Sequence, residues 1–244
     1  MDVVYVVGDY GGRWECKELV YSIRSLVNIE FDNIWIVGKK PMWFNNKIKH
    51  YNIKDIYPNK TSNVIRKILK ICNNNHISED FILMNDDFLF MTPQEIQSYT
   101  WGDLEDLWPT KRGKYKQSLI RSIEICKLLN IPTKNYEVHY PMIINKTKFM
   151  RIFDNINWVS NPPCYRSIYG NYYNIEAEEI VEDFKAYNDK DWFKLKNGSF
   201  ISLNDDTVLY KKVAEDIPKI FNTRSIYEKD LSYSCIRGKN EDKL

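Results

Sequence analysis

The sequence predicts an α/β protein whose central sheet is mostly parallel and flanked by helices. Over roughly the first 90 residues, short apolar runs alternate with segments in which apolar residues recur every three or four positions. This alternation is typical of βαβ units, which place parallel strands side by side. The chain has 244 residues, of which 43% are hydrophobic and 14% aromatic, and it is therefore long enough to bury a substantial core.

Four apolar runs are expected to form strands. Val3–Val7 and Phe81–Met84 are uninterrupted, as in strands that are buried on both faces of a sheet. Asn33–Val37 and Ser199–Leu203 are runs of the same kind. Three of the four precede residue 90, so the sheet is expected to form mainly from the N-terminal part of the chain.

Six segments are expected to be helices. In the first of them, Leu19, Ile23 and Leu26 fall on one face, and the second repeats this spacing. The expected helices are Glu18–Leu26, Ser62–Ile71, Lys116–Leu129, Lys146–Phe153, Glu176–Ala186 and Thr207–Phe221. The first two lie between expected strands, which completes the βαβ order.

Charge and cysteine content indicate the surroundings in which the protein works. The formal net charge is +2, from 35 basic and 33 acidic residues, so no strong field favours nucleic acid or an anionic membrane. The five cysteines are dispersed without C-x-x-C spacing, as expected for reduced thiols. The N-terminal run lacks the features of a signal peptide, and no apolar run is long enough to span a membrane. We therefore expect a soluble, cytoplasmic protein.

The most informative segment is Asn85-Asp86-Asp87, which interrupts an apolar run. Buried carboxylates are costly unless they are paired or bind a metal. Two adjacent carboxylates at the end of a core strand suit Mg²⁺ or Mn²⁺ bridged to a diphosphate, because Mg²⁺ commonly takes one or two protein carboxylates plus phosphate oxygens. Ligands of open parallel sheets also bind outside the carboxyl ends of the strands. Asn and Asp equally favour a simple polar turn, so this segment alone leaves both interpretations open.

A second acidic group follows the last expected strand. Asn204, Asp205 and Asp206 come directly after the apolar run that ends at Leu203. They could complete the same site from another strand. Asp205 or Asp206 could instead be the N-cap of the next helix, which is a common use of Asp.

His139 lies in Tyr136–Pro141, at a strand-like end before a proline. A histidine near its ordinary pKa is the usual general base for a hydroxyl. A lone histidine also commonly has a structural role, so its position alone does not decide between the two.

Phosphate-binding groups are the remaining candidates. Arginine forks match phosphate oxygens, and Arg24 and Arg166 are the candidates, although a solvated surface arginine is the default. Gly8–Gly12 follows the first strand, is glycine-rich and contains Asp9, and its backbone amides could approach a nucleotide. Walker-type and Rossmann glycine motifs are absent from the sequence.

The order of these features along the chain is more specific than any one of them. Four blocks follow one another: Asp2–Asp9; Glu18–Leu26 continuing to Phe81–Phe90; Val138–Met142 with Arg166 downstream; and Ser199–Asp205 continuing to Ser225–Glu228. In this order they resemble the four regions of the Stealth family, which includes bacterial capsular-polysaccharide sugar-phosphate transferases and the catalytic part of the lysosomal-enzyme GlcNAc-phosphotransferase. Val20 and Gly38-Lys39 depart from the family pattern. Both positions belong to the half of that pattern that contacts the nucleotide.

The resemblance implies a single GT-A-like nucleotide-sugar transferase domain over residues 1–228, with a tail at residues 229–244. It implies that Asp86 and Asp87 bind Mg²⁺ or Mn²⁺. It also implies that His139 is the active-site histidine and Arg166 a phosphate-binding residue. Asp9, Arg24 and Asn204 are expected to contact the donor as well.

The expected function is metal-dependent transfer of a sugar or sugar-1-phosphate from a nucleotide-diphosphate sugar to an acceptor hydroxyl, with a glycan as the expected acceptor. Both versions of the reaction need the same grip on the donor, so the sequence does not separate them. One alternative is a phage-type glycosyltransferase acting on modified DNA bases, with a local basic face around Lys111, Arg112, Lys114 and Lys116. An alternative of another class is a non-catalytic nucleotide-sugar-binding module.

Overall fold

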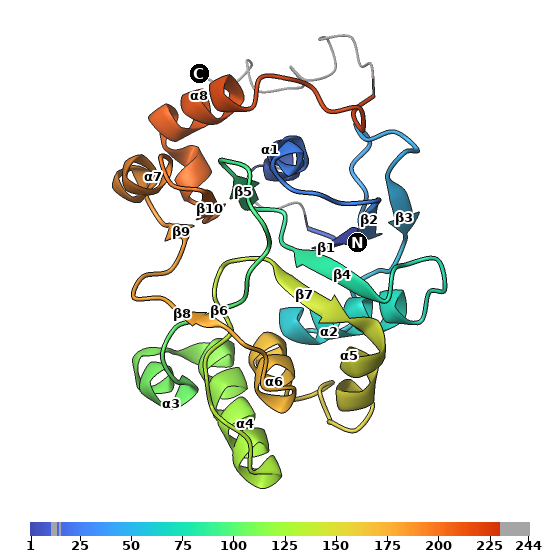
Figure 1. The fold of residues 1–244 in the computed structure, drawn as a ribbon, viewed down its shortest axis with the longest axis vertical. Coiled ribbons are helices and arrows are strands. Elements are labelled where there is room, and N and C mark those ends of the chain that lie inside the picture. Colours follow the sequence, from blue (N-terminus) through green and yellow to red (C-terminus); the bar gives the residue numbers. More distant parts are fainter. Residues whose placement is uncertain (11–13, 15, 230–244) are drawn as a thin grey trace.

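The computed structural model describes residues 1–10, 14 and 16–229. Within these residues the largest sheet has five strands in the order β3-β2-β1-β4-β7 (Figure 1). Four of them are parallel, and β7 joins the edge antiparallel to β4. The strands are β1 (Asp2–Val7), β2 (Ile34–Gly38), β3 (Lys49–Tyr51), β4 (Asp80–Met84) and β7 (Met142–Asn145).

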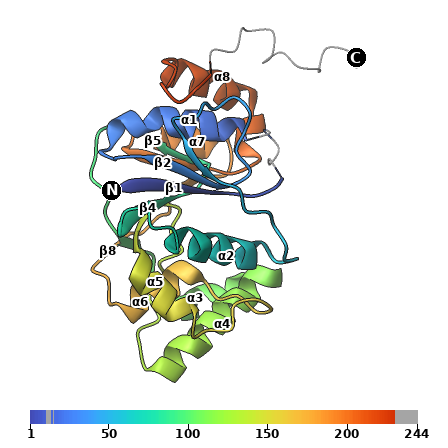
Figure 2. The ribbon, with the colours of Figure 1, turned by 90° about the vertical axis from the view of Figure 1, so that its right-hand side faces the viewer.

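Helices cover both faces of this sheet (Figure 2). α1 (Lys17–Ser25) packs on one face, while α2 (Lys60–Cys72) and α5 (Lys146–Phe153) lie on the other. Side chains alternate between the faces along each strand. In β4, for example, Ile82 faces the α1 side, whereas Leu83 faces the α2 side.

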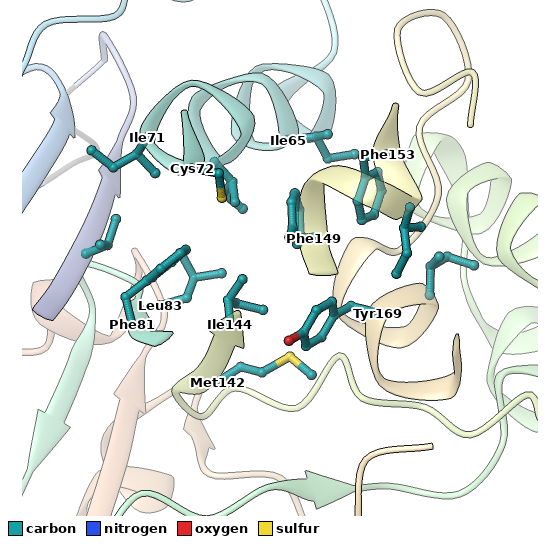
Figure 3. Close-up of a cluster of buried hydrophobic side chains, with 14 of the residues drawn as sticks. Ile65, Ile71, Cys72, Phe81, Leu83, Met142, Ile144, Phe149, Phe153 and Tyr169 are labelled. Atoms are coloured by element: carbon teal, nitrogen blue, oxygen red, sulfur yellow. The ribbon is translucent and has the colours of Figure 1, made fainter. Parts of the chain in front are cut away.

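The core on the α2 side joins the sheet to several helices (Figure 3). Its members include residues of β4, β7, α2, α5 and α6 (Tyr165–Tyr172). Side chains that accept backbone hydrogen bonds fix the starts of two of these helices. Asn59 accepts from Thr61 N at 2.9 Å, and Asn145 accepts from Lys148 N at 3.0 Å.

A second sheet begins directly after β4. In the described part of the chain it has three strands in the order β5-β10-β9, and its core also contains side chains of α7 and α8. Because only three residues separate β4 from β5, the turn between them lies where the two sheets meet. The elements are β5 (Phe88–Phe90), β9 (Lys185–Ala186), β10 (Phe200–Leu203), α7 (Asp189–Leu195), the 3₁₀ helix η3 (Thr207–Leu209) and α8 (Lys211–Ile220).

Apart from η1, which directly follows α1 and contacts β5, the remaining elements lie below the sheet in Figure 1. Tyr99–Thr100 (β6) pairs in parallel with Glu178–Glu179 (β8). The other elements are η1 (Leu26–Asn28), α3 (Leu104–Leu107), η2 (Trp108–Thr110) and α4 (Gly113–Leu129). No helix in the described ranges is long and apolar enough to cross a membrane.

The structure confirms an α/β fold with a mostly parallel sheet, and the four expected strands are present. The expected helix Glu176–Ala186 is wrong, because this segment contains β8 and β9. Those residues pair with strands that lie far away in the sequence, and such pairing overrides local spacing. The expected helix Thr207–Phe221 is divided into η3 and α8 at Tyr210.

Two further expectations concern single segments. The segment around His139 is irregular, and the strand begins only at Met142. The expected tail at residues 229–244 lies outside the described residues, apart from Lys229.

Candidate active site

The turn between β4 and β5 carries Asn85, Asp86 and Asp87 at the carboxyl end of a central strand. Asp87 is anchored to the second sheet: its Oδ2 accepts a hydrogen bond from Ser202 Oγ at 2.7 Å and from Lys185 Nζ at 3.4 Å. Its backbone carbonyl accepts from Leu203 N at 3.0 Å. The position of this turn therefore depends on both sheets.

Negative charge is concentrated at this turn. Burial, and then the charge of Asp87, raises the pKa of Asp86 to about 6. Asp205, from the turn after β10, acts on Asp86 in the same direction. A cation bound beside these carboxylates would relieve their mutual repulsion.

Glu18, in the first turn of α1, is a fourth carboxylate of this group. Burial, followed by the charges of Asp86, Asp205 and Asp87, raises its pKa to about 8. Its Oε2 is buried and has no hydrogen-bond partner among the described residues. From the sequence, Glu18 was expected only to be part of a helix. The available signal was that it falls on the same helical face as the buried Ser22 and Ser25.

Asn204, which was expected to contact the nucleotide-sugar donor, lies beside this group of carboxylates. Asn204 lines a hollow together with Glu18, Asp87 and Asp205. Its backbone N–H donates to Ala186 O at 3.0 Å. Of the two expected capping residues, Asp206 is the N-cap of η3, while Asp205 faces the hollow.

His139 is held by Asp183, which sequence analysis did not identify. His139 Nδ1 lies 2.5 Å from Asp183 Oδ2, and the backbone N–H of His139 donates to Asp183 Oδ1 at 3.0 Å. Burial alone would raise the pKa of Asp183, but the hydrogen bond and charge of His139 hold this pKa below its ordinary value. Because Nδ1 is engaged, Nε2 is the ring nitrogen left for proton exchange with a substrate.

Arg166 connects the histidine segment to the acidic turn. Its side chain is buried, and Nη1 donates to Val138 O at 3.2 Å and to Tyr140 O, on either side of His139. Its Nη2 donates to Asn85 Oδ1 at 3.3 Å. The structure therefore brings together Asn85–Asp87, His139 and Arg166. Phosphate binding by Arg166 stays a prediction.

Two other residues that were expected to contact the nucleotide-sugar donor lie in different surroundings. Arg24, in the last turn of α1, donates to both carboxylate oxygens of Glu228, at 2.8 and 2.7 Å, and to Phe221 O at 2.7 Å. Because α1 connects two parallel neighbouring strands, its last turn is directed away from their carboxyl ends. Arg24 is thus not grouped with the acidic turn.

Asp9 follows β1 and pairs with Asp55. Asp9 N donates to Asp55 Oδ2 at 3.0 Å, and Asp55 N donates to Asp9 Oδ2 at 2.9 Å. The buried Lys67 of α2 donates to Asp55 Oδ1 at 2.6 Å and to Val7 O at 2.8 Å. These contacts build a second polar group at the carboxyl end of β1.

The carboxylate oxygens of the acidic turn fit a divalent cation whose other ligands come from a substrate. Among the described residues, no three or more His, Cys, Asp or Glu side chains are arranged to hold a metal ion on their own. Mg²⁺ does not require such a cage, since one or two carboxylates, phosphate oxygens and water commonly complete its shell. Asp86 and Asp87 supply that partial set.

Comparison with known proteins identifies the fold. No family model and no curated protein matches the chain. Among solved structures, the galactosyltransferase LgtC, crystallised with donor and acceptor sugar analogues, shares 10% sequence identity with a TM-score of 0.50, over 92% of this chain and 96% of LgtC.

Two other glycosyltransferases overlap less well. GlyE of Streptococcus pneumoniae TIGR4 has 9% identity and a TM-score of 0.41. The match covers 91% of this chain but only 60% of GlyE. A glycosyltransferase involved in glycosylation of the major capsid of PBCV-1 has 10% identity and a TM-score of 0.36, over 91% of this chain and 98% of that one. These similarities do not single out the Stealth family. The likeness to LgtC shows that the chain has the GT-A glycosyltransferase fold.

Proposed function

We propose that this protein is a metal-dependent glycosyltransferase that moves a sugar from a nucleotide-diphosphate sugar to an acceptor hydroxyl on a glycan. The observation that carries this proposal is the link made by Arg166. Its guanidinium joins the carbonyls on either side of His139 to Asn85 of the acidic turn. Arg166 thereby links the acidic turn, which would bind the diphosphate through a metal ion, to the segment of the candidate general base.

Each residue has a definite task in this proposal. Asp86 and Asp87 would hold Mg²⁺ or Mn²⁺, which supplies charge neutralisation for the departing diphosphate. His139 accepts the proton of the acceptor hydroxyl at Nε2, a contribution of about 10²–10⁴-fold for general bases. Asp183 keeps the imidazole in one orientation through Nδ1 and stabilises its charged form.

Sugar-phosphate transfer is a second candidate reaction, favoured by the order of the four sequence blocks that resemble the Stealth family. In this version the acceptor hydroxyl attacks the β-phosphorus, and a nucleoside monophosphate leaves. In the glycosyl version C1 is attacked, and a nucleoside diphosphate leaves. The nucleotide product therefore distinguishes the two reactions.

The test is a panel of nucleotide sugars incubated with Mn²⁺, with and without glycan acceptors or duplex DNA that carries hydroxymethylated bases. Release of diphosphate supports glycosyl transfer, and release of monophosphate supports sugar-phosphate transfer. Metal-dependent binding without turnover would indicate a non-catalytic module. Neither turnover nor metal-dependent binding with any donor would remove the proposal.

A matched pair of variants ties the activity to the site. Asp87→Asn is expected to abolish metal-dependent turnover while the fold is retained, because the amide is a poor ligand for a hard cation. Asp154→Asn, at an exposed position after α5, is the control and should keep wild-type rates. Equal rates in both variants would remove Asp87 from the site.

A further inference from the structure

Basic side chains border the candidate active site at the starts of two helices. Lys60 is the first residue of α2, which leads from β3 to β4 and therefore begins at the carboxyl edge of these parallel strands. α4 lies on the same side of the sheet as α2 (Figure 2), and residues 111–116 at its start include four basic and no acidic side chains. We name the following set the basic surface: Lys60, Lys111, Arg112, Lys114 and Lys116.

The starts of these two helices are in contact. Lys114 Nζ donates a hydrogen bond to Pro58 O at 3.3 Å, two residues before α2 begins. Burial and the charge of Asp87 raise the pKa of Asp86, and the charge of Lys60 opposes this rise. The basic surface therefore begins beside the acidic turn and continues onto α4.

α4 also borders the segment that contains His139. Ser122 Oγ of α4 accepts a hydrogen bond at 2.7 Å from the backbone N–H that directly precedes α6. α6 carries Arg166, which donates to the carbonyls on either side of His139. Partial burial raises the pKa of Tyr115, in the first turn of α4, and the charge of Asp183 adds to this rise. The basic surface thus extends from the acidic turn toward the candidate general base.

The charge of the basic surface is not balanced by carboxylates in the described part of the chain. None of its five described side chains forms a salt bridge, whereas Lys127, at the other end of α4, pairs with Glu105 at 2.6 Å. Two carboxylates on the α4 side are engaged elsewhere: Glu137 Oε1 accepts from Ser167 N at 3.0 Å, and Asp183 holds the imidazole. Because the net charge of the whole chain is only +2, this unpaired charge is a local feature. Five like charges beside one site repel one another, and an anionic ligand would relieve this repulsion.

We propose that the basic surface binds an acceptor glycan that carries carboxylate or phosphate groups, while the acceptor hydroxyl lies at His139. The inference rests on the proposed function and deepens it, because it names the chemical class of the acceptor. Lysine and arginine donate charge-assisted hydrogen bonds to carboxylate and phosphate oxygens. A cluster of like charges also attracts an oppositely charged chain from a distance and raises its rate of association.

The distribution of charge favours a glycan over duplex DNA. Duplex DNA carries one negative charge per roughly 1.7 Å of its axis, and proteins that bind it present an extended basic face. Here the segment that leads to Asp183 carries the exposed Glu176, Glu178, Glu179 and Glu182. These carboxylates repel a uniformly charged duplex, whereas a glycan with spaced charges can place them at the basic surface alone.

The first test compares charged and neutral glycans that share one backbone. One pair of probes is the hexamer of galacturonic acid and its methyl ester, and the other is phosphorylated maltohexaose and maltohexaose. At low salt the wild type should bind the charged member of at least one pair about 10-fold more tightly than the neutral member. This difference should shrink at about 1 M salt, where the Debye length is only about 3 Å. Thermophoresis of labelled probes gives the Kd values, and the responding pair identifies the charged group as carboxylate or phosphate.

A triple variant locates the effect on the basic surface. Lys111→Gln combined with Arg112→Gln and Lys114→Gln removes three of its charges and should abolish the preference for the charged glycan. Lys60 is left unchanged in this variant, because its charge also acts on Asp86.

A matched triple variant removes the same charge from another part of the molecule. Lys70→Gln combined with Lys148→Gln and Arg151→Gln changes three exposed residues of α2 and α5. Lys70 lies in the last turn of α2, and α5 begins at the far end of the antiparallel strand β7, so these residues are directed away from the carboxyl edge of the sheet. This control should keep the preference of the wild type.

Three results would overturn the inference. One is a wild type that binds the charged and neutral members of both pairs equally. Another is an equal loss of preference in the two triple variants, which would show an effect of net charge alone. The third is tighter binding of duplex DNA than of either charged glycan at the same salt concentration, which would assign the basic surface to nucleic acid.

Binding and turnover separate this inference from the proposed function. If no donor is turned over but the wild type prefers charged glycans and the triple variant of the basic surface does not, the proposed function fails and the binding surface stands. If donors are turned over and charged and neutral acceptors have equal KM values, this inference fails alone. An increase in the KM of the donor as large as that of the charged acceptor would place the basic surface on the donor phosphates, and would also overturn it.

A single substitution keeps the test valid if the triple variant does not fold. Arg112 is exposed, precedes the first residue of α4 and makes no side-chain capping hydrogen bond. Arg112→Glu reverses one charge of the basic surface and should weaken binding of the charged glycan more than Arg112→Gln does. A thermal melt that gives the wild-type Tm for both variants is the folding control. Unchanged binding of the charged glycan in a folded Arg112→Glu protein would count against the inference.

Discussion

The carboxylate of Asp183 holds His139 at two points. One oxygen lies 2.5 Å from Nδ1 of the imidazole, and the other accepts the backbone N–H of the same residue at 3.0 Å. The side chain of Asp183 is 9% exposed, whereas that of His139 is 31% exposed. The pair therefore consists of a buried anchor and a histidine that is open on one side.

Replacement of Asp183 by asparagine is expected to reduce kcat about 10²-fold and to leave the KM of the donor unchanged, because the amide neither fixes the tautomer nor stabilises the imidazolium. Steady-state kinetics across pH should also show a displaced acidic limb for kcat, because a general base is inactive in its protonated form. The neighbouring Glu182→Gln is the control, since Glu182 is exposed and forms an ion pair with the equally exposed Lys194. Equal kcat values in the two variants would argue against a positioning role.

Replacement of Arg166 by lysine separates two roles of this residue. Lysine keeps the charge but not the fork that joins Val138, Tyr140 and Asn85. If Arg166 positions the turn, kcat should fall at least about 10-fold and stability should drop by about 1–3 kcal/mol. If it binds donor phosphate instead, the KM of the donor should rise with little loss of stability. Arg151→Lys, at an exposed position on α5, serves as the control.

The contact between Arg24 and Glu228 is expected to support the fold. Glu228→Gln should lower the free energy of unfolding at pH 7 by about 1–3 kcal/mol and leave kcat unchanged, because it removes a bidentate partner of a largely buried guanidinium. Glu124→Gln breaks an exposed pair with Arg121 and should cost at most about 0.5 kcal/mol.

The same pair predicts a pH dependence. Burial alone would raise the pKa of Glu228, but Arg24 holds this pKa below its ordinary value of 4.5. A carboxylate with a lowered pKa in the folded state stabilises the protein above its unfolded pKa, and the contribution is lost as the pH falls through the folded value. Urea unfolding should therefore show that the difference between wild type and Glu228→Gln narrows below pH 4.5. A constant difference would contradict the assignment.

Gly38 is required by the close approach of two strands. It ends β2 opposite Val7 with φ of +116°, and a Cβ atom there would lie 1.9 Å from Val7 O. Gly38→Ala should therefore cost about 2–4 kcal/mol. Gly102 also has a positive φ, of +59°, but nothing lies within 4 Å of its Cβ position, so Gly102→Ala should cost only about 1 kcal/mol. Denaturant unfolding that gives equal losses would refute the steric argument.

Comparison of sequence and structure shows which features are local. The strand Phe81–Met84 and the helix Lys146–Phe153 were predicted because their patterns repeat within one element. The position of Asp86 and Asp87 at a strand end followed from the same pattern. In contrast, Glu176–Ala186 has helical spacing but forms two strands, because its partners β6 and β10 lie elsewhere in the chain.

The sequence by itself determined the α/β class, the acidic turn at the end of β4 and the candidate histidine. Only the tertiary structure decided the partners of these residues: Asp183 for His139, Asn85 for Arg166 and Glu228 for Arg24. It also placed Glu18 beside the acidic turn. The physical reason is that periodicity reports which face of an element is buried, whereas the contacts of a polar side chain depend on how distant segments close around it.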